Sequence, residues 1–90
     1  MAKFVNIGFG NVVNVSKVQA IVNPDAAPIK RMVQNAKEDG RAIDATQGRK
    51  TKAVIFLQEN QLLLSALQPE TIARRITAGY EYETRGEEDE

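Results

Sequence analysis

The densest cluster of side chains able to bind a ligand is a short basic segment near the middle of the sequence. Arg49, Lys50 and Lys52 lie within the four residues that follow Gly48, and residues 45–58 contain no acid. A guanidinium donates paired hydrogen bonds to phosphate oxygens, an ammonium group acts as a point charge, and glycine lets a backbone approach a ligand closely. The segment therefore indicates a phosphate-binding loop. A solvated entrance to a strand is an equally good interpretation of the cluster taken alone.

Two glycine-containing segments match nucleotide-binding motifs only in part. Gly8-Phe9-Gly10 lacks the third glycine, the following helix and the downstream acid of a dinucleotide-binding fold, so a plain glycine turn is favoured. Gly48-Arg49-Lys50-Thr51 ends like a phosphate-binding loop, but Ile43 stands where the Walker pattern requires its first glycine. We therefore predict no nucleotide cofactor and no small-molecule substrate.

The sequence offers no catalytic site. Histidine and cysteine are both missing, so Ser16 and Ser65 have no imidazole to activate them, and there is no thiolate to act as a nucleophile or a metal ligand. Asp44 is expected to accept backbone hydrogen bonds in its own turn. We predict a protein that is not an enzyme and binds no metal, since the acidic residues of its first 80 positions show no paired spacing: Asp25, Glu38, Asp39, Asp44, Glu59 and Glu70.

The net charge of zero hides two unlike regions. Residues 1–80 carry eleven Lys or Arg against six Asp or Glu, a net charge of +5, whereas residues 81–90 carry one Arg against six acids, a net charge of −5. No apolar run approaches the ~20 residues that cross a bilayer, and no export signal is recognisable at the start. We expect one basic domain over residues 1–79, a disordered acidic tail over residues 80–90, and a cytoplasmic, nucleoid-associated protein without membrane contact.

The N-terminal part of the domain is expected to be extended chain. Residues 3–7 alternate as a strand does, residues 8–11 form a turn, and residues 12–22 are rich in β-branched side chains. Polar residues interrupt the last segment, which indicates two short strands or a bulge. Lys17 is expected to lie exposed at that break.

Two helices are predicted. The first covers residues 26–39, with Pro28 in its first turn and Gly40 at its end. The second covers residues 70–78 after Pro69. The side chains expected to face inward are Ile29, Met32, Val33, Ala36, Ile72, Ala73 and Ile76, and the cations expected on solvated faces are Lys30, Arg31, Lys37, Arg74 and Arg75.

A hairpin completes the predicted fold. Residues 52–57 and 61–67 should pair across the polar turn 58–60, while residues 43–48 are expected to be a connection. The apolar runs of the two strands do not alternate, so both faces of the hairpin should be covered. One helix layer covers one face, and we expect a partner subunit on the other. The fold class is thus α/β (α+β), a small antiparallel sheet with two helices in a homo-oligomer.

Five segments, in order and spanning nearly all of residues 3–77, closely resemble the RemA family, which regulates extracellular-matrix genes in bacteria. The segments are Lys3-Phe4-Val5-Asn6-Ile7-Gly8-Phe9-Gly10-Asn11, Ala27-Pro28-Ile29-Lys30-Arg31-Met32, Ile43-Asp44-Ala45-Thr46, Gly48-Arg49-Lys50-Thr51-Lys52 and Leu64-Ser65-Ala66-Leu67-Gln68-Pro69-Glu70-Thr71. The resemblance implies a subunit with a LytTR-like core, a closed ring whose basic rim binds duplex DNA, control of biofilm-matrix operons, and no cofactor.

Carried over by position, the DNA-contacting residues of the family fall on Lys17, Arg49 and Lys50, and a functionally sensitive proline falls on Pro28. Arginine is expected at positions 17 and 50, and lysine there keeps the charge but loses the two-pronged donor. Lys52 joins the expected DNA-binding set because it lies in the same basic segment.

Two other functions are compatible with the same sequence. One is an oligomeric scaffold or protein-binding ring without DNA binding, whose acidic tail engages basic partners. The other is RNA binding, which the sequence supports less because splayed bases need an aromatic platform. The aromatic residues are only Phe4, Phe9, Phe56, Tyr80 and Tyr82.

Overall fold

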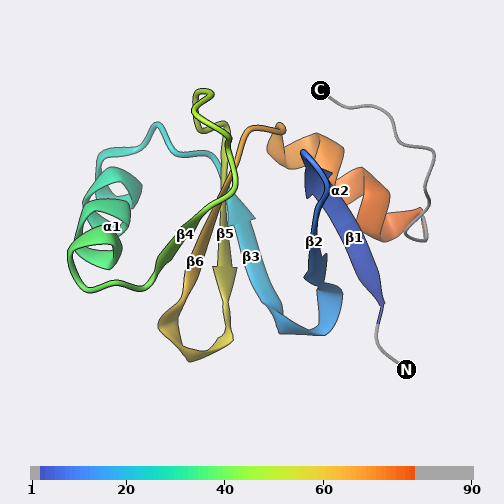
Figure 1. The fold of residues 1–90 in the computed structure, drawn as a ribbon, viewed down its shortest axis with the longest axis horizontal. Helices are drawn as coiled ribbons and strands as arrows, with labels where there is room; N and C mark the ends of the chain where they lie inside the picture. Colours follow the sequence, from blue (N-terminus) through green and yellow to red (C-terminus); the bar gives the residue numbers. More distant parts are fainter. Residues whose placement is uncertain (1–2, 79–90) are drawn as a thin grey trace.

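The computed structural model describes residues 3–78, which form six strands and two α-helices (Figure 1). The strands are β1 (Phe4–Gly8), β2 (Asn11–Asn14), β3 (Val18–Val22), β4 (Ala42–Asp44), β5 (Ala53–Leu57) and β6 (Leu62–Ser65), and the helices are α1 (Ala27–Glu38) and α2 (Pro69–Thr77). Two short 3-10 turns, η1 (Val15–Lys17) and η2 (Gln58–Asn60), complete the order. The predicted acidic tail, residues 80–90, lies outside the described residues.

A four-stranded sheet in the order β3-β5-β6-β4 forms the centre of the molecule. β5 is antiparallel to β3 and to β6, as the hairpin prediction required, but β4 is parallel to β6. The expected purely antiparallel sheet is therefore wrong, and the segment expected to be only a connection contributes a strand. β4 is three residues long, too short for its side chains to show a period, and its pairing depends on contacts with residues about twenty positions later.

A second sheet consists of the β1–β2 hairpin alone. Val5, Ile7 and Val13 point inward and are buried, whereas Phe4 and Val12 lie on the outer face and are exposed. The alternation predicted for the first strand is confirmed, because successive side chains of a strand point to opposite faces.

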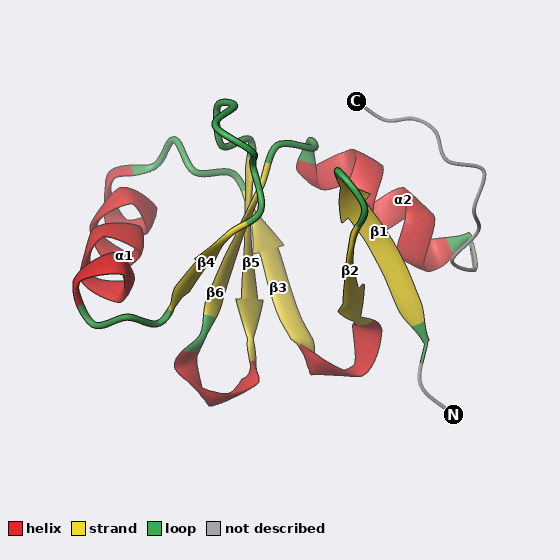
Figure 2. Ribbon diagram, in the orientation of Figure 1, coloured by secondary structure: helices red, strands yellow, loops and turns green. Residues whose placement is uncertain are grey.

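Both faces of the central sheet are covered within the chain (Figure 2). On one face α1 packs on β5 and β6 around Ala36, Val54, Leu62 and Leu64. On the other, the β1–β2 hairpin and α2 enclose a second cluster, which contains Val5, Ile7, Val13, Ala45, Ala53, Ile55, Leu63 and Ile72. The prediction that both faces are covered is confirmed, but the inference that a partner subunit must cover one of them is wrong. The hairpin and α2 form a third layer.

The helices agree with their predicted bounds to within one residue. Pro28 lies in the first turn of α1, where its missing N–H has no intrahelical acceptor to lose. Met32 and Ala73, both expected to face inward, are exposed instead. Each lies at the margin of its apolar stripe. Neither helix within residues 3–78 is long and apolar enough to cross a membrane.

Candidate nucleic-acid interface

The connection between β4 and β5, residues 45–52, contains the basic segment, and we call it the basic loop. Its backbone turns at Thr46–Arg49, where the N–H of Arg49 donates to the carbonyl oxygen of Thr46 over 3.0 Å. The two central residues, Gln47 and Gly48, have φ angles of 57° and 79°. Positive φ at both central positions is the geometry of a type I′ turn, and glycine adopts it without steric cost.

Both ends of the basic loop are fixed to β6. The N–H of Ala45 donates to the carbonyl oxygen of Leu64 over 2.9 Å, and the N–H of Lys52 donates to the carbonyl oxygen of Ser65 over 2.9 Å. The side chains of Arg49, Lys50 and Lys52 are exposed, and none of them pairs with an acidic side chain within residues 3–78. Three cations are therefore presented to solvent from a backbone of defined shape.

Asp44 fixes the entrance of the basic loop. Its Oδ1 accepts the N–H of Thr46 over 2.9 Å and the hydroxyl of the same residue over 2.6 Å. These hydrogen bonds, the side-chain one first, lower the pKa of the Asp44 carboxyl below its usual value. Burial opposes them with a smaller effect, and the charge of Lys37 adds the smallest contribution, which also lowers the pKa. The prediction that Asp44 accepts hydrogen bonds within its own turn is confirmed.

Phe9 contacts the basic loop, a contact that sequence reasoning missed. The guanidinium carbon of Arg49 lies 5.5 Å from the centre of the Phe9 ring, within the range of a cation–π interaction. Phe9 occupies the tip of the β1–β2 hairpin, forty residues away in the sequence. The sequence did contain one indication of a surface contact: Phe9 lies between two glycines in a predicted turn, where an apolar side chain is not expected to pack in the core.

Ser65 joins the hairpin to the strand that anchors the basic loop. The buried hydroxyl of Ser65 donates to the carbonyl oxygen of Ile7 over 2.8 Å and accepts the N–H of Leu67 over 3.1 Å. Next to this contact, a Cβ atom at Gly8 would lie 3.4 Å from the Leu67 side chain, so the chains pass closely there. The hairpin tip and the basic loop are thus both attached to the end of β6, at the same end of the molecule (Figure 1).

Lys17 lies at the opposite end of the sheet from the basic loop. It ends η1 just before Val18, which pairs with Leu57 at the far end of β5, whereas Lys52 precedes the first residue of β5. The length of β5, about 13 Å, therefore separates Lys17 from the loop. Lys17 is exposed at the break between two strands, as predicted. The structure brings Arg49, Lys50 and Lys52 together but leaves Lys17 apart.

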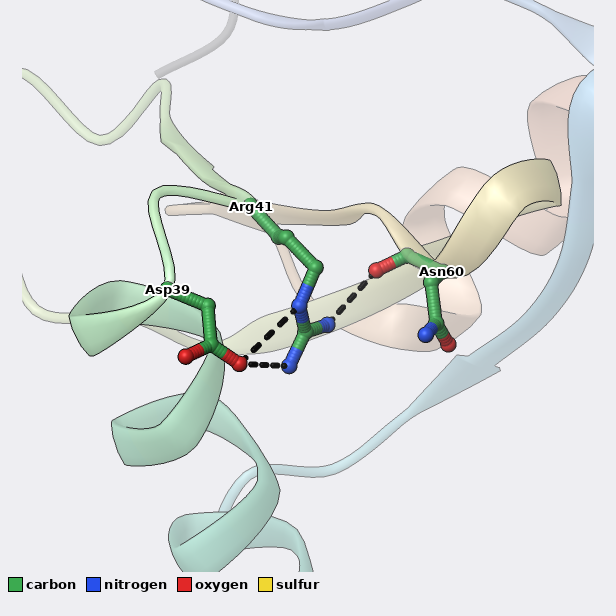
Figure 3. Close-up of polar contacts among 3 residues, drawn as sticks. All are labelled: Asp39, Arg41 and Asn60. Carbon is green, nitrogen blue, oxygen red and sulfur yellow. Dashed lines mark hydrogen bonds and ion pairs between the residues drawn. The ribbon is translucent and has the colours of Figure 1, made fainter.

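Two other arginines have structural contacts. Arg41 forms an ion pair with Asp39 at 3.1 Å, and its Nη1 donates to the carbonyl oxygen of Asn60 over 2.7 Å, which links the end of α1 to η2 (Figure 3). Arg75 donates to the carbonyl oxygen of Asn6 over 2.9 Å and is half-buried. The expectation that Arg75 is only a solvated surface residue is wrong, because α2 packs against β1 on that side.

Comparisons with known proteins show which family the sequence is similar to. Residues 4–76 match the family model described as "Extracellular matrix regulatory protein A-like", also called RemA-like. Relatives named "Putative regulatory protein" occur in Lachnoclostridium phytofermentans, with 59% identity over 84% of each chain, and in Clostridium kluyveri, with 51% identity over 98% of this chain and 89% of the relative. A Geobacillus kaustophilus protein of that name is 46% identical over 96% of this chain and 99% of its own. The family match covers every described helix and strand except Thr77, the last residue of α2.

Proposed function

This chain belongs to the RemA-like family of regulatory proteins, which are not enzymes, and from this premise we propose that it is a DNA-binding transcriptional regulator. In this proposal it acts in the cytoplasm as a ring-shaped homo-oligomer, contacts the phosphates of duplex DNA through the basic loop, and controls biofilm-matrix genes. It needs no cofactor for this task.

The observation that carries the proposal is the construction of the basic loop. Arg49, Lys50 and Lys52 extend from a turn whose two ends are hydrogen-bonded to β6, and no acidic side chain within residues 3–78 neutralises them. A fixed, unpaired cluster of cations is suited to phosphate oxygens, which Arg binds through paired donors and Lys as a point charge. The neighbouring Thr46 is buried, which keeps the loop seated on the sheet.

Repetition around an oligomer would make these few cations sufficient. Each phosphate contact steepens the dependence of log affinity on log salt by about 0.9, so three contacts in one subunit give modest binding. A ring repeats the cluster, and DNA must bend around the rim to satisfy all copies. Base edges would then contribute little, and the deformability of the DNA would set the preference for particular sites.

Exposed apolar side chains support self-association. Phe4 and Val12, on the outer face of the β1–β2 hairpin, are 42% and 40% exposed, and Ile43 on the edge strand β4 is 48% exposed. One of these surfaces belongs to the β1–β2 hairpin and the other to the edge strand of the central sheet, so they are unlike surfaces of the molecule. Contact between unlike surfaces of successive copies generates a ring when the rotation closes.

Lys17 and Pro28 take different roles in this proposal. Lys17, one sheet length from the basic loop, would contact a separate phosphate or DNA held mainly by a neighbouring subunit. Pro28 lies in the first turn of α1 and would act by setting the start of that helix, since its ring fixes φ where the helix begins.

The deciding experiment is a titration of duplex DNA at several salt concentrations with the full chain and with Arg49→Ala and Lys50→Ala. Each variant should bind more weakly, and the slope of log affinity against log salt should fall by about 0.9 for each phosphate that the variant no longer binds. Thermal stability should stay near that of the unaltered protein, because both side chains are exposed.

Lys30→Ala is the matched control, since Lys30 is an exposed lysine on α1, outside the basic loop. It should keep the affinity and the slope of the full chain. If the unaltered protein fails to bind duplex DNA while remaining an oligomer, the proposal is wrong and a protein-binding scaffold is favoured. Preference for single-stranded RNA over duplex DNA would favour the RNA-binding alternative.

A further inference from the structure

Phe9 occupies a position that the folding of the core does not explain. It is 38% exposed and has a φ angle of +56°, in the left-handed region that bulky side chains rarely adopt. Two asparagines hold the turn: Asn6 Oδ1 accepts the N–H of Gly8 over 2.7 Å, and Asn11 Nδ2 donates to the carbonyl oxygen of Gly8 over 3.0 Å. An exposed aromatic ring in an unfavourable backbone conformation points to a function outside the core.

The only aromatic-to-cation contact within residues 3–78 is between this ring and Arg49. Its two members come from separate segments that are both attached to the end of β6, the hairpin through Ser65 Oγ and the basic loop through the carbonyl oxygen of Ser65. These hydrogen bonds fix the two backbone segments from which the ring and the guanidinium extend, so the two side chains start from defined positions at the same end of the sheet.

We propose that Phe9 is a positioning residue that holds the Arg49 guanidinium against its ring and so presents the N–H donors of Arg49 to a DNA phosphate. The guanidinium is planar, and its donors lie at the edge of that plane. Contact between one face and an aromatic ring leaves the edge free to donate. Holding a long side chain in its bound conformation before DNA arrives reduces the entropy lost on binding.

This inference requires arginine at position 49. Lysine would keep the charge, but its ammonium group has neither a planar face nor paired donors. Arg49→Lys should therefore weaken duplex binding although the net charge is unchanged, and most of the effect of Phe9 should disappear with it. The inference rests on the proposed DNA binding for its effect on affinity, but the contact itself can be tested without DNA.

The contact is tested by NMR of the DNA-free full chain. Ring currents of Phe9 should move the δ-methylene protons of Arg49 upfield, Phe9→Leu should return them to ordinary positions, and Phe9→Tyr should keep the shift. Phe9 is on the surface, so both variants should retain the circular dichroism spectrum of the unaltered protein. If the Arg49 protons have the same positions in all three proteins, the proposal is wrong, whatever the protein binds.

The effect on binding is tested by a double-mutant cycle with duplex DNA at low salt. Phe9→Leu should weaken binding about two- to fivefold for each loop engaged, the size of an exposed cation–π contact, and Phe9→Tyr should restore it. In the Arg49→Ala background Phe9→Leu should have no further effect. An equal loss in both backgrounds would mean that Phe9 acts independently of Arg49 and would overturn the proposal.

Failure of this inference differs from failure of the proposed function. If Arg49→Ala weakens binding and Phe9→Leu does not, the basic loop binds DNA but Phe9 does not position it, and the inference is rejected. If neither Arg49→Ala nor Lys50→Ala changes affinity, the DNA-binding role of the loop is rejected. Without a DNA-binding loop the proposed presentation of Arg49 to phosphate is rejected too, even where the NMR shifts confirm the ring contact.

Discussion

Short polar side chains shape the surface that carries the cations. Asp44 binds the N–H and hydroxyl of Thr46 at the entrance of the basic loop, and Asn6 and Asn11 bind the backbone of Gly8 at the hairpin tip. Such side chains compete well for nearby backbone groups, which is why they are common in turns. In this protein they shape the two turns that carry Phe9 and Arg49.

Asp44→Ala should lower the free energy of unfolding at pH 7 by about 0.5–1 kcal/mol, a small value because the carboxylate is exposed to solvent screening. The pKa of Asp44 is lowered in the folded protein from 3.8, so its stabilisation is present above pH 3.8 and is lost as the pH falls through the folded value. Urea unfolding should show a difference in free energy of unfolding between the unaltered protein and Asp44→Ala that is constant near pH 7 and becomes smaller as the pH approaches 3. A difference that persists unchanged at pH 3 would mean that the charge is not its source.

Among the elements, β6 organises the candidate interface. It pairs with β5 and β4, anchors both ends of the basic loop, and through Ser65 holds the end of β1. All four of its residues are buried, so its hydrogen bonds are protected from water. The loop and the hairpin tip therefore share one rigid support.

Ser65→Ala should lower the free energy of unfolding by about 1–3 kcal/mol, because the carbonyl oxygen of Ile7 would stay buried without its donor. Ser16→Ala is the matched control: that serine is exposed and bonds only to Asn14 within its own turn, so the change should stay within about 0.5 kcal/mol. Chemical denaturation of the two variants checks this. Equal stability of both would show that the link between hairpin and sheet contributes nothing.

At the scale of the whole molecule, α1, the central sheet, and the β1–β2 hairpin with α2 form three layers. This arrangement leaves only a few large apolar side chains exposed. The two core clusters lie inside the chain, on either side of the central sheet. The exposed large apolar side chains within residues 3–78 are Phe4, Phe9, Val12, Met32 and Ile43. We therefore assign the proposed self-association to the outer face of the β1–β2 hairpin and the β4 edge, which expose Phe4, Val12 and Ile43, rather than to an uncovered face of the sheet.

Light scattering at micromolar concentration should give a mass well above 9.9 kDa for the full chain. Phe4→Glu should shift the mass towards that of one subunit, because it places a charge on the exposed outer face of the hairpin. Gln58→Glu, an equal change of charge on the exposed η2 turn, should leave the mass unchanged. A single-subunit mass for the unaltered protein would contradict the ring.

Deletion of residues 81–90 should strengthen DNA binding at low salt. This segment, outside the described residues, carries a net charge of −5 against +5 for the rest of the chain, and so can compete with phosphate for the basic loop. The difference should be clear at about 30 mM salt and fade near 150 mM, where the Debye length is about 8 Å. Equal affinities of full-length and truncated protein at the lower concentration would contradict autoinhibition.

The sequence alone determined the features that depend on neighbouring residues. Alternation of apolar and polar residues predicted the first strand, and Pro28 and Gly40 predicted the bounds of α1. The polar turn at residues 58–60 predicted the β5–β6 hairpin, and the basic loop was recognisable as a run of basic residues. Five short segments in order also indicated the RemA family, which the family model confirms. The structural signals are local, since backbone dihedrals and side-chain period are set within a few residues.

Only the tertiary structure decided the features that depend on contacts between residues far apart in the sequence. The parallel pairing of β4, the internal covering of the second sheet face, the separation of Lys17 from the basic loop, and the Phe9–Arg49 contact all require segments far apart in sequence to meet. The hydrogen bond from Ser65 to Ile7 spans 58 residues. No local pattern encodes such a contact, because it forms only when packing of the whole core brings the two strands together.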